Sequence, residues 1–115
     1  MRLYIDSALT YDWDKWAKRG VLYGATTNPL IFKKQSVDLN RKTVFRLIDS
    51  AKDMGLTSVQ FQVYGLNHPR DAAKQMARFF DRWQDGVTAK VPLTAEGLAI
   101  LPLLPKDAPI TLTAA

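Results

Sequence analysis

The stretch of sequence that most suggests chemistry runs from Val87 to Gly97 and carries one lysine, Lys90, among β-forming residues. Burying an ammonium group costs several kcal/mol unless something compensates. Burial therefore favours the neutral amine, which can attack a carbonyl carbon and form a Schiff base. The alternative is a surface lysine on an edge strand, and this stretch alone leaves both interpretations open.

The residues after Lys90 predict how it is positioned. Pro92 ends the β-rich run, Thr94 is a suitable helix N-cap, and Glu96 falls in the first helical turn, where the helix dipole favours a carboxylate. The pattern is that of a strand, a turn and a helix, with Lys90 near the C-terminal end of the strand.

Strand and helix patterns alternate along the whole chain. Alternating or β-rich runs predict strands at 2–6, 21–27, 57–63, 87–91 and 110–113, and helical periodicity predicts helices at 11–19, 38–54, 68–84 and 94–101. Asn28-Pro29 breaks the second strand, and a loop is expected to follow. The predicted buried helix stripes are Val44, Leu47, Ile48 and Ala51, then Ala73, Met76, Ala77 and Phe80, with Trp13, Trp16 and Ala17 at helical spacing in the first helix.

This order indicates an α/β protein with a parallel sheet and right-handed crossovers. No change in composition marks a second domain, so residues 1–115 are expected to form a single domain. Two architectures fit: a doubly wound sheet, and part of a (β/α)8 barrel.

The faces of the strands favour the barrel. Strands covered by helices on both faces should be apolar on both, but each strand here has one apolar and one polar face. Active sites of (β/α)8 barrels lie at the C-terminal ends of the strands. The polar side chains found at or near those ends are Asp6, Thr26, Asn28, Gln62, Lys90 and Thr113.

The composition of the chain limits the classes of ligand and site that are expected. The chain has a net charge of +5 and a pI near 9.6, which favours anionic ligands. Its basic residues are scattered, and no groove-entering motif or basic–aromatic platform is present, so nucleic acid is not an expected partner. With no cysteine and His68 as the only histidine, disulfides, thiolate metal sites and a Ser-His-Asp triad are not expected.

The sequence also gives no sign of a membrane partner. No apolar run approaches the roughly 18 residues that span a bilayer. The first residues lack the apolar core and cleavage site of a signal peptide. A cytoplasmic protein is therefore expected.

Several segments together resemble the transaldolase family, and most closely its branch of small bacterial transaldolases and fructose-6-phosphate aldolases. They are Leu3-Tyr4-Ile5-Asp6, Thr26-Thr27-Asn28-Pro29, Lys90-Val91-Pro92-Leu93-Thr94, Glu96-Gly97-Leu98 and Thr111-Leu112-Thr113. The resemblance implies a (β/α)8 TIM barrel of the class I aldolase type and Schiff-base chemistry without a metal or an organic cofactor. It also implies a place in carbohydrate metabolism such as the pentose phosphate pathway.

The resemblance assigns the central chemical roles to two residues. Lys90 would attack the carbonyl of a ketose sugar phosphate such as fructose 6-phosphate and hold the dihydroxyacetone unit, first as an imine and then as an enamine. Asp6 would orient the substrate and take part in proton transfer at the carbon–carbon bond being cleaved.

Further positions would support this chemistry. Asn28 would hydrogen-bond near the imine, Thr26 and Thr27 would shape the same corner, and Thr113 would help to place a water molecule. Gln62 stands where transaldolases usually carry glutamate and the aldolases carry glutamine, which favours the aldolase branch. Gln60 offers an alternative register for this position.

The resemblance covers only strands one to five of the family's barrel, so a truncated barrel is expected. Its first and fifth strands would be edges that invite pairing. Three accounts fit: the chain is a truncated gene product or a fragment, a second copy of the chain completes the barrel, or a separate polypeptide does. Self-association is the favoured route to a stable particle. Enzymatic activity would then depend on assembly. The alternative is a catalytically inactive half-barrel that acts as an assembly or interaction module.

Overall fold

Five parallel strands form one sheet in sequential order, β1-β2-β3-β4-β5, in the computed structural model, which describes residues 2–113. They are β1 (Leu3–Asp6), β2 (Leu22–Thr26), β3 (Ser58–Gln62), β4 (Val87–Pro92) and β5 (Ile110–Thr113). A doubly wound sheet reverses its strand order at a switch point, whereas a barrel keeps the order of the sequence. The α/β class and the arrangement of a partial barrel are confirmed.

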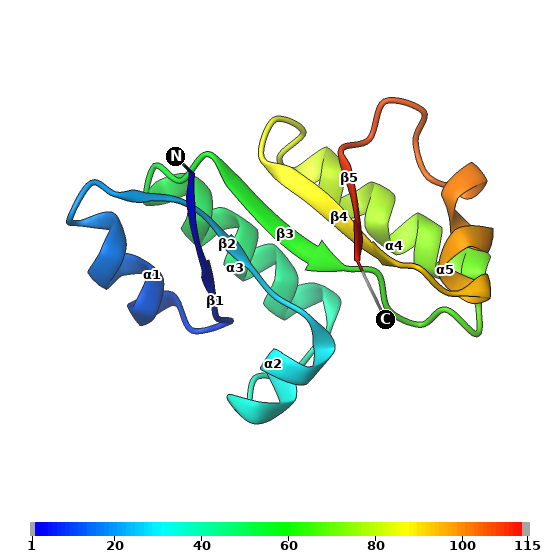
Figure 1. The fold of residues 1–115 in the computed structure, drawn as a ribbon, viewed down its shortest axis with the longest axis horizontal. Coiled ribbons are helices and arrows are strands. Elements are labelled where there is room, and N and C mark those ends of the chain that lie inside the picture. Colours follow the sequence, from blue (N-terminus) through cyan, green and yellow to red (C-terminus); the bar gives the residue numbers. More distant parts are fainter. Residues whose placement is uncertain (1, 114–115) are drawn as a thin grey trace.

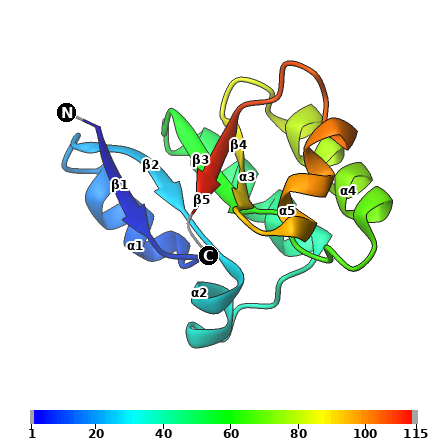
Figure 2. The same cartoon turned by 45° about the vertical axis from the view of Figure 1, so that its right-hand side comes forward.

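The helices lie on one face of this sheet. They are α1 (Thr10–Ala17), α3 (Arg41–Asp53), α4 (Pro69–Arg82) and α5 (Ala95–Ile100), the last continued by the 3-10 turn η1 (Leu101–Leu103). Figure 1 shows α3 and α4 behind the strands, and in Figure 2 the same face carries α5 beside α4. The opposite face of the sheet has no helix over it among residues 2–113. No helix in this part of the chain is long and apolar enough to cross a membrane.

The core lies between the helices and the apolar side of the three middle strands. Val59 and Phe61 of β3 and Val87, Ala89 and Val91 of β4 are almost fully buried. The predicted stripe of α3 is buried throughout, as expected from its 3.6-residue period.

The predicted stripe of α4 is only partly right. Ala73, Met76 and Phe80 are buried, but Ala77 is half-buried and Phe79 is buried in addition. Phe79 packs between Phe45 and Phe61, with ring centroids 5.7 Å and 6.2 Å away. Phe79 thus belongs to the buried stripe, and its ring buries more apolar area than the side chain of an alanine.

One other prediction, for the first third of the chain, is wrong. The expected loop after Asn28-Pro29 contains a helix, α2 (Pro29–Lys34), which lies beyond the C-terminal end of β2. The pair that breaks the strand also starts this helix, since Asn28 is its N-cap and Pro29 fits its first position. Trp16 is 37% exposed, because α1 covers the edge of the sheet instead of its centre.

Candidate functional site

Lys90 stands in the middle of the polar face of the sheet. Its neighbours in register are Gln62 on β3 and Thr111 on β5. The side chain is half-buried, and its Nζ donates a 3.4 Å hydrogen bond to the carbonyl oxygen of Thr27. The amine therefore reaches past β3 to the C-terminal end of β2.

Asp6 reaches the same end of β2 from the other side. It pairs in register with Thr26, whose Oγ1 donates a hydrogen bond to the Asp6 Oδ1 atom. Lys90 thus contacts Thr27, the residue directly after β2, and Asp6 contacts Thr26, the last residue of β2, from strands on opposite sides of it. The structure brings the predicted nucleophile and the predicted carboxylate to one corner of the sheet.

Each residue of Thr26-Thr27-Asn28-Pro29 also has a structural task. The Thr27 side chain is fully buried and donates to the carbonyl oxygen of Gln60 at 3.1 Å, so only its main-chain oxygen faces Lys90. The Asn28 Oδ1 atom accepts from the Ile31 amide at 2.9 Å and caps α2. The side-chain amide nitrogen of Asn28 is the part that this cap does not use.

The structure resolves the register of the two glutamines on β3. Gln62 lies beside Lys90. Gln60 lies two residues nearer the N-terminal end of β3, beside Thr26 and Thr88. Both are half-buried. Gln62 is therefore the glutamine that accompanies the lysine.

Thr113 lies further along than the others. It pairs in register with Pro92, two residues beyond the level of Lys90, and its carbonyl oxygen accepts from the Leu93 amide at 2.9 Å. Its side chain shares the polar face with Lys90 because the two positions have the same parity in paired strands. No side-chain hydrogen bond joins Thr113 to the other predicted site residues within the described part of the chain.

A polar network that sequence reasoning missed fixes the loop directly after Asp6. Ser7 is buried, and its Oγ donates to Asp12 at 2.8 Å, while its carbonyl oxygen accepts from the Trp13 indole at 2.8 Å. Gln35, which follows α2, accepts from the Ala8 amide at 2.7 Å and donates to the Ser7 Oγ at 3.1 Å. Gln35 therefore ties the loop after β1 to the helix that Asn28 caps. Nothing in the periodicity distinguishes these residues; an indole N–H on the buried side of a short helix was the one available signal.

Gly97 holds the end of β4 close to α5. The Thr94 side chain caps α5 by accepting from the Gly97 amide at 3.0 Å. A Cβ atom at Gly97 would overlap the carbonyl oxygen of Pro92, which is backbone and cannot turn away. Glycine lets the helix begin directly against the strand that carries Lys90.

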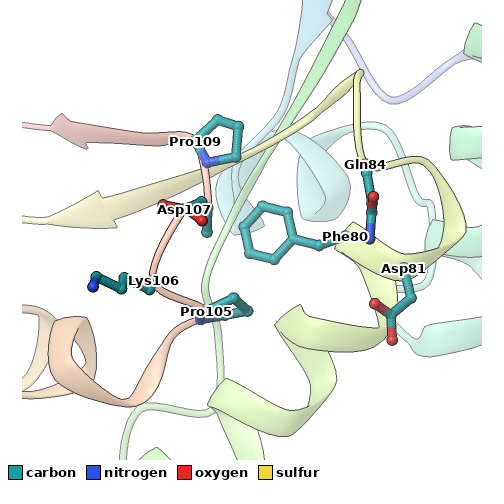
Figure 3. A pocket seen from close by; sticks show the side chains of 8 residues that line it. Phe80, Asp81, Gln84, Pro105, Lys106, Asp107 and Pro109 are labelled. Carbon is teal, nitrogen blue, oxygen red and sulfur yellow. The ribbon is translucent and has the colours of Figure 1, made fainter.

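A pocket of about 350 Å³ lies at the other end of the sheet (Figure 3). It is bounded by Phe80 and Gln84 at the end of α4 and by the segment from Pro105 to Pro109. These residues precede β4 and β5, so the pocket is at the N-terminal ends of the strands, away from Lys90. Among residues 2–113 no group of three or more histidine, cysteine, aspartate or glutamate residues is placed to hold a metal ion.

Several curated proteins with similar sequences are named probable transaldolase. A probable transaldolase of Dehalococcoides mccartyi is 34% identical over 107 residues, which is 93% of this chain and 47% of that protein. A probable transaldolase of Streptococcus pyogenes serotype M1 is 32% identical with the same coverage. The resemblance to transaldolases is confirmed. No family model matches the sequence.

The transaldolase relatives are longer than this chain, which spans about half of their length. The match takes in almost all of the chain, and any stretch of 107 residues must include β2, β3 and β4. The segments that contain Asn28, Gln62 and Lys90 therefore lie within the part that matches the transaldolase relatives.

Proposed function

We propose that the chain carries the Schiff-base centre of a class I aldolase or transaldolase that acts on ketose sugar phosphates such as fructose 6-phosphate. The observation behind the proposal is that Lys90 and Asp6 contact successive residues, Thr27 and Thr26, at one strand end. The relatives named probable transaldolase support the same reaction class. Such an enzyme would work where sugar phosphates occur, in the cytoplasm.

Lys90 would form the covalent intermediate. Its Nζ adds to the C2 carbonyl of the ketose, and the carbonyl oxygen leaves as water, so that an imine results. The Thr27 carbonyl, 3.4 Å from Nζ, holds the amine over the polar face before attack. This step needs no metal and no organic cofactor.

Asp6 would then accept the proton of the C4 hydroxyl group. The C3–C4 bond breaks, its electron pair moves into the imine to give an enamine, and an aldehyde phosphate leaves. The Thr26 hydroxyl donates a hydrogen bond to Oδ1 of Asp6. The Oδ2 atom of this exposed carboxylate therefore remains available to the substrate. Asn28 would bind near the imine through its amide nitrogen.

The fate of the dihydroxyacetone unit distinguishes the two branches. Release requires water to hydrolyse the imine, whereas transfer requires a second aldehyde to take up the enamine. Gln62 cannot exchange a proton as an acid or base but can orient a water molecule beside Lys90. Thr113, further along the same face, would help to hold that water, and the glutamine favours release.

Borohydride trapping tests the proposal. Reduction of the chain with dihydroxyacetone or fructose 6-phosphate should add a stable mass to the peptide that contains Lys90. Lys90→Ala should lose the adduct, and the matched control Lys106→Ala, at an exposed lysine near the opposite end of the sheet, should keep it. An absence of adduct on the wild-type chain in its assembled form would contradict the proposal.

The alternative function is an inactive half-barrel that serves as an assembly module. Among residues 2–113 no helix covers the polar face, and β1 and β5 are the outer strands of the sheet. In that case Lys90→Ala would leave assembly unchanged, and the wild-type chain would form no adduct. Adduct formation at Lys90, together with aldol cleavage that the variant loses, would exclude it.

A further inference from the structure

Three hydrogen-bonded side chains join α3 and α4 to the loop that follows β3. The Arg41 Nε atom donates to the Gln75 Oε1 atom at 2.8 Å, and the Gln75 Nε2 atom donates to the Tyr64 hydroxyl oxygen at 3.0 Å. Arg41 is the first residue of α3, Gln75 lies in α4, and Tyr64 comes two residues after β3. Both helices begin at the end of the sheet where β3 ends (Figure 1). None of the three side chains takes part in the proposed Schiff-base chemistry.

The donors and acceptors of this row can be assigned in only one way. Arginine donates hydrogen bonds and never accepts them, so the side-chain oxygen of Gln75 must face Arg41 and its nitrogen must face Tyr64. The Tyr64 oxygen then accepts from Gln75, and its own proton remains for another acceptor. The Nη groups of Arg41 also remain, because only Nε is used. Both ends of the row therefore offer hydrogen-bond donors.

These donors line a pocket of about 290 Å³. The residues that complete its lining are Gly65, His68, Asp71 and Ala72. Within residues 2–113 Arg41 forms no ion pair, although the Asp71 carboxylate lines the same pocket. The guanidinium is held by an uncharged amide instead, so its charge remains for a ligand. Its planar fork suits the oxygen atoms of a carboxylate or a phosphate.

The charges around the pocket favour an anion, with one exception. Arg41 is one cation, and Arg70 is a second, since it borders an adjoining hollow that shares His68 and Asp71 with the pocket. The N-terminal ends of α3 and α4 add positive partial charge. Asp71 is the exception, because a carboxylate repels an anion and accepts hydrogen bonds. A ligand that suits all of these groups has an anionic end and hydroxyl groups elsewhere.

We propose that this pocket binds a small hydroxylated phosphate monoester. Its phosphate oxygens accept hydrogen bonds from the Arg41 Nη groups and the Tyr64 hydroxyl, and its hydroxyl groups donate to Asp71. The volume is at the lower end of the range for small-molecule sites, which suits a ligand of a few carbon atoms. Such a ligand needs no carbonyl group, so the proposal does not depend on the chemistry of Lys90.

A titration with glycerol phosphate, followed by amide NMR, tests the proposal. The Gly65 and Asp71 amide signals should shift saturably, with a dissociation constant of about 1 mM or below. Inorganic phosphate should bind more weakly, because it brings no carbon-bound hydroxyl to Asp71, and glycerol should not bind. The shifts should persist in Lys90→Ala. Their loss in that variant would place the ligand on the polar face and overturn the proposal, as would an absence of shifts in the wild-type chain.

A pair of arginine variants separates the pocket from general attraction to a basic protein. Arg41→Gln removes the guanidinium fork and should weaken glycerol phosphate binding by about tenfold or more. Arg46→Gln removes the same charge from α3 at an exposed residue outside the pocket, and its affinity should match that of the wild type. Equal weakening in the two variants would mean nonspecific attraction and would overturn the proposal.

Asp71→Asn provides a test in the opposite direction. Removing the carboxylate takes away a repulsive charge, so inorganic phosphate should bind about twofold to fivefold tighter. The advantage of glycerol phosphate over inorganic phosphate should shrink, because an amide oxygen is a weaker acceptor than a carboxylate. Poor folding of the variant would not produce such a gain. Unchanged affinities for both probes would show that Asp71 does not contact the ligand and would contradict the proposed site.

Discussion

Two adjacent threonines show how closely structure and chemistry are combined at this site. Thr26 faces the polar side and donates to Asp6, while Thr27 turns inward and donates to the carbonyl of Gln60. One side chain serves the candidate site and the next serves the core, because successive residues of a strand point to opposite faces. The sequence alone therefore does not show which residues of Thr26-Thr27-Asn28-Pro29 serve the candidate site and which serve the core.

Valine substitutions at Thr26 and Thr27 should affect stability and adduct formation in opposite ways. Thr26→Val removes a hydrogen bond at an exposed carboxylate, so stability should change by less than about 0.5 kcal/mol. Trapping at Lys90 should slow with fructose 6-phosphate, because Asp6 is no longer held. Thr27→Val should cost about 1 kcal/mol for the lost buried hydrogen bond and leave trapping nearly intact. Urea unfolding and the rate of adduct formation measure the two effects, and equal behaviour of the variants would contradict this division.

The elements that carry the site are held by contacts outside it. The loop after β1 is fixed by Gln35, which follows α2, and by Asp12 and Trp13 of α1. The end of β4 is fixed by α5 through Gly97. Strand ends frame the site, but short helices at the same end of the sheet decide where those strand ends lie.

Gln35→Ala should loosen the loop that follows Asp6. The Ala8 amide would lose its partner inside the structure, at a cost of about 1–3 kcal/mol. Hydrogen exchange at Ala8 should accelerate, and urea unfolding should shift to lower concentration. Gln84→Ala, an exposed glutamine at the opposite end of the sheet, is the control and should change neither. Unchanged exchange at Ala8 would mean that Gln35 does not hold the loop.

At the scale of the whole molecule, the helices cover one face of the sheet and bury the core there, whereas no helix among residues 2–113 covers the polar face. The helix layer is bound together at its surface by an ion pair between Asp49 of α3 and Arg82 of α4, with 2.6 Å between Oδ2 and Nη2. The Arg82 guanidinium holds the pKa of Asp49 below its ordinary value of 3.8, chiefly through the hydrogen bond.

This ion pair gives stability a pH dependence with a definite sign. Because the pKa of Asp49 is lowered on folding, its contribution is complete above the unfolded value of 3.8 and is lost as the pH falls through the folded value. The effect should be small, since both side chains are 46% exposed. Asp49→Asn should flatten the decline of unfolding free energy below pH 4 and lower stability slightly at pH 7. A decline as steep as that of the wild type would exclude Asp49 as a contributor.

The sequence by itself determined the order of the five strands and of helices α1, α3, α4 and α5, and the two faces of the sheet. Both follow from local rules: period-two alternation in Val59 to Val63, and a 3.6-residue stripe in Val44 to Ala51. Polar residues at strand ends could be found in the same way. Gly20 and Gly55, which follow the first and second predicted helices, adopt the positive φ that ends a helix.

Only the tertiary structure decided which of these polar residues meet. Register between strands places Gln62 beside Lys90 and moves Thr113 beyond it, and register depends on pairing across the sheet. The helix α2, the network around Ser7 and the exposure of Trp16 likewise depend on neighbours distant in the sequence. Local patterns specify which face a side chain occupies, but contacts between distant segments determine what it touches.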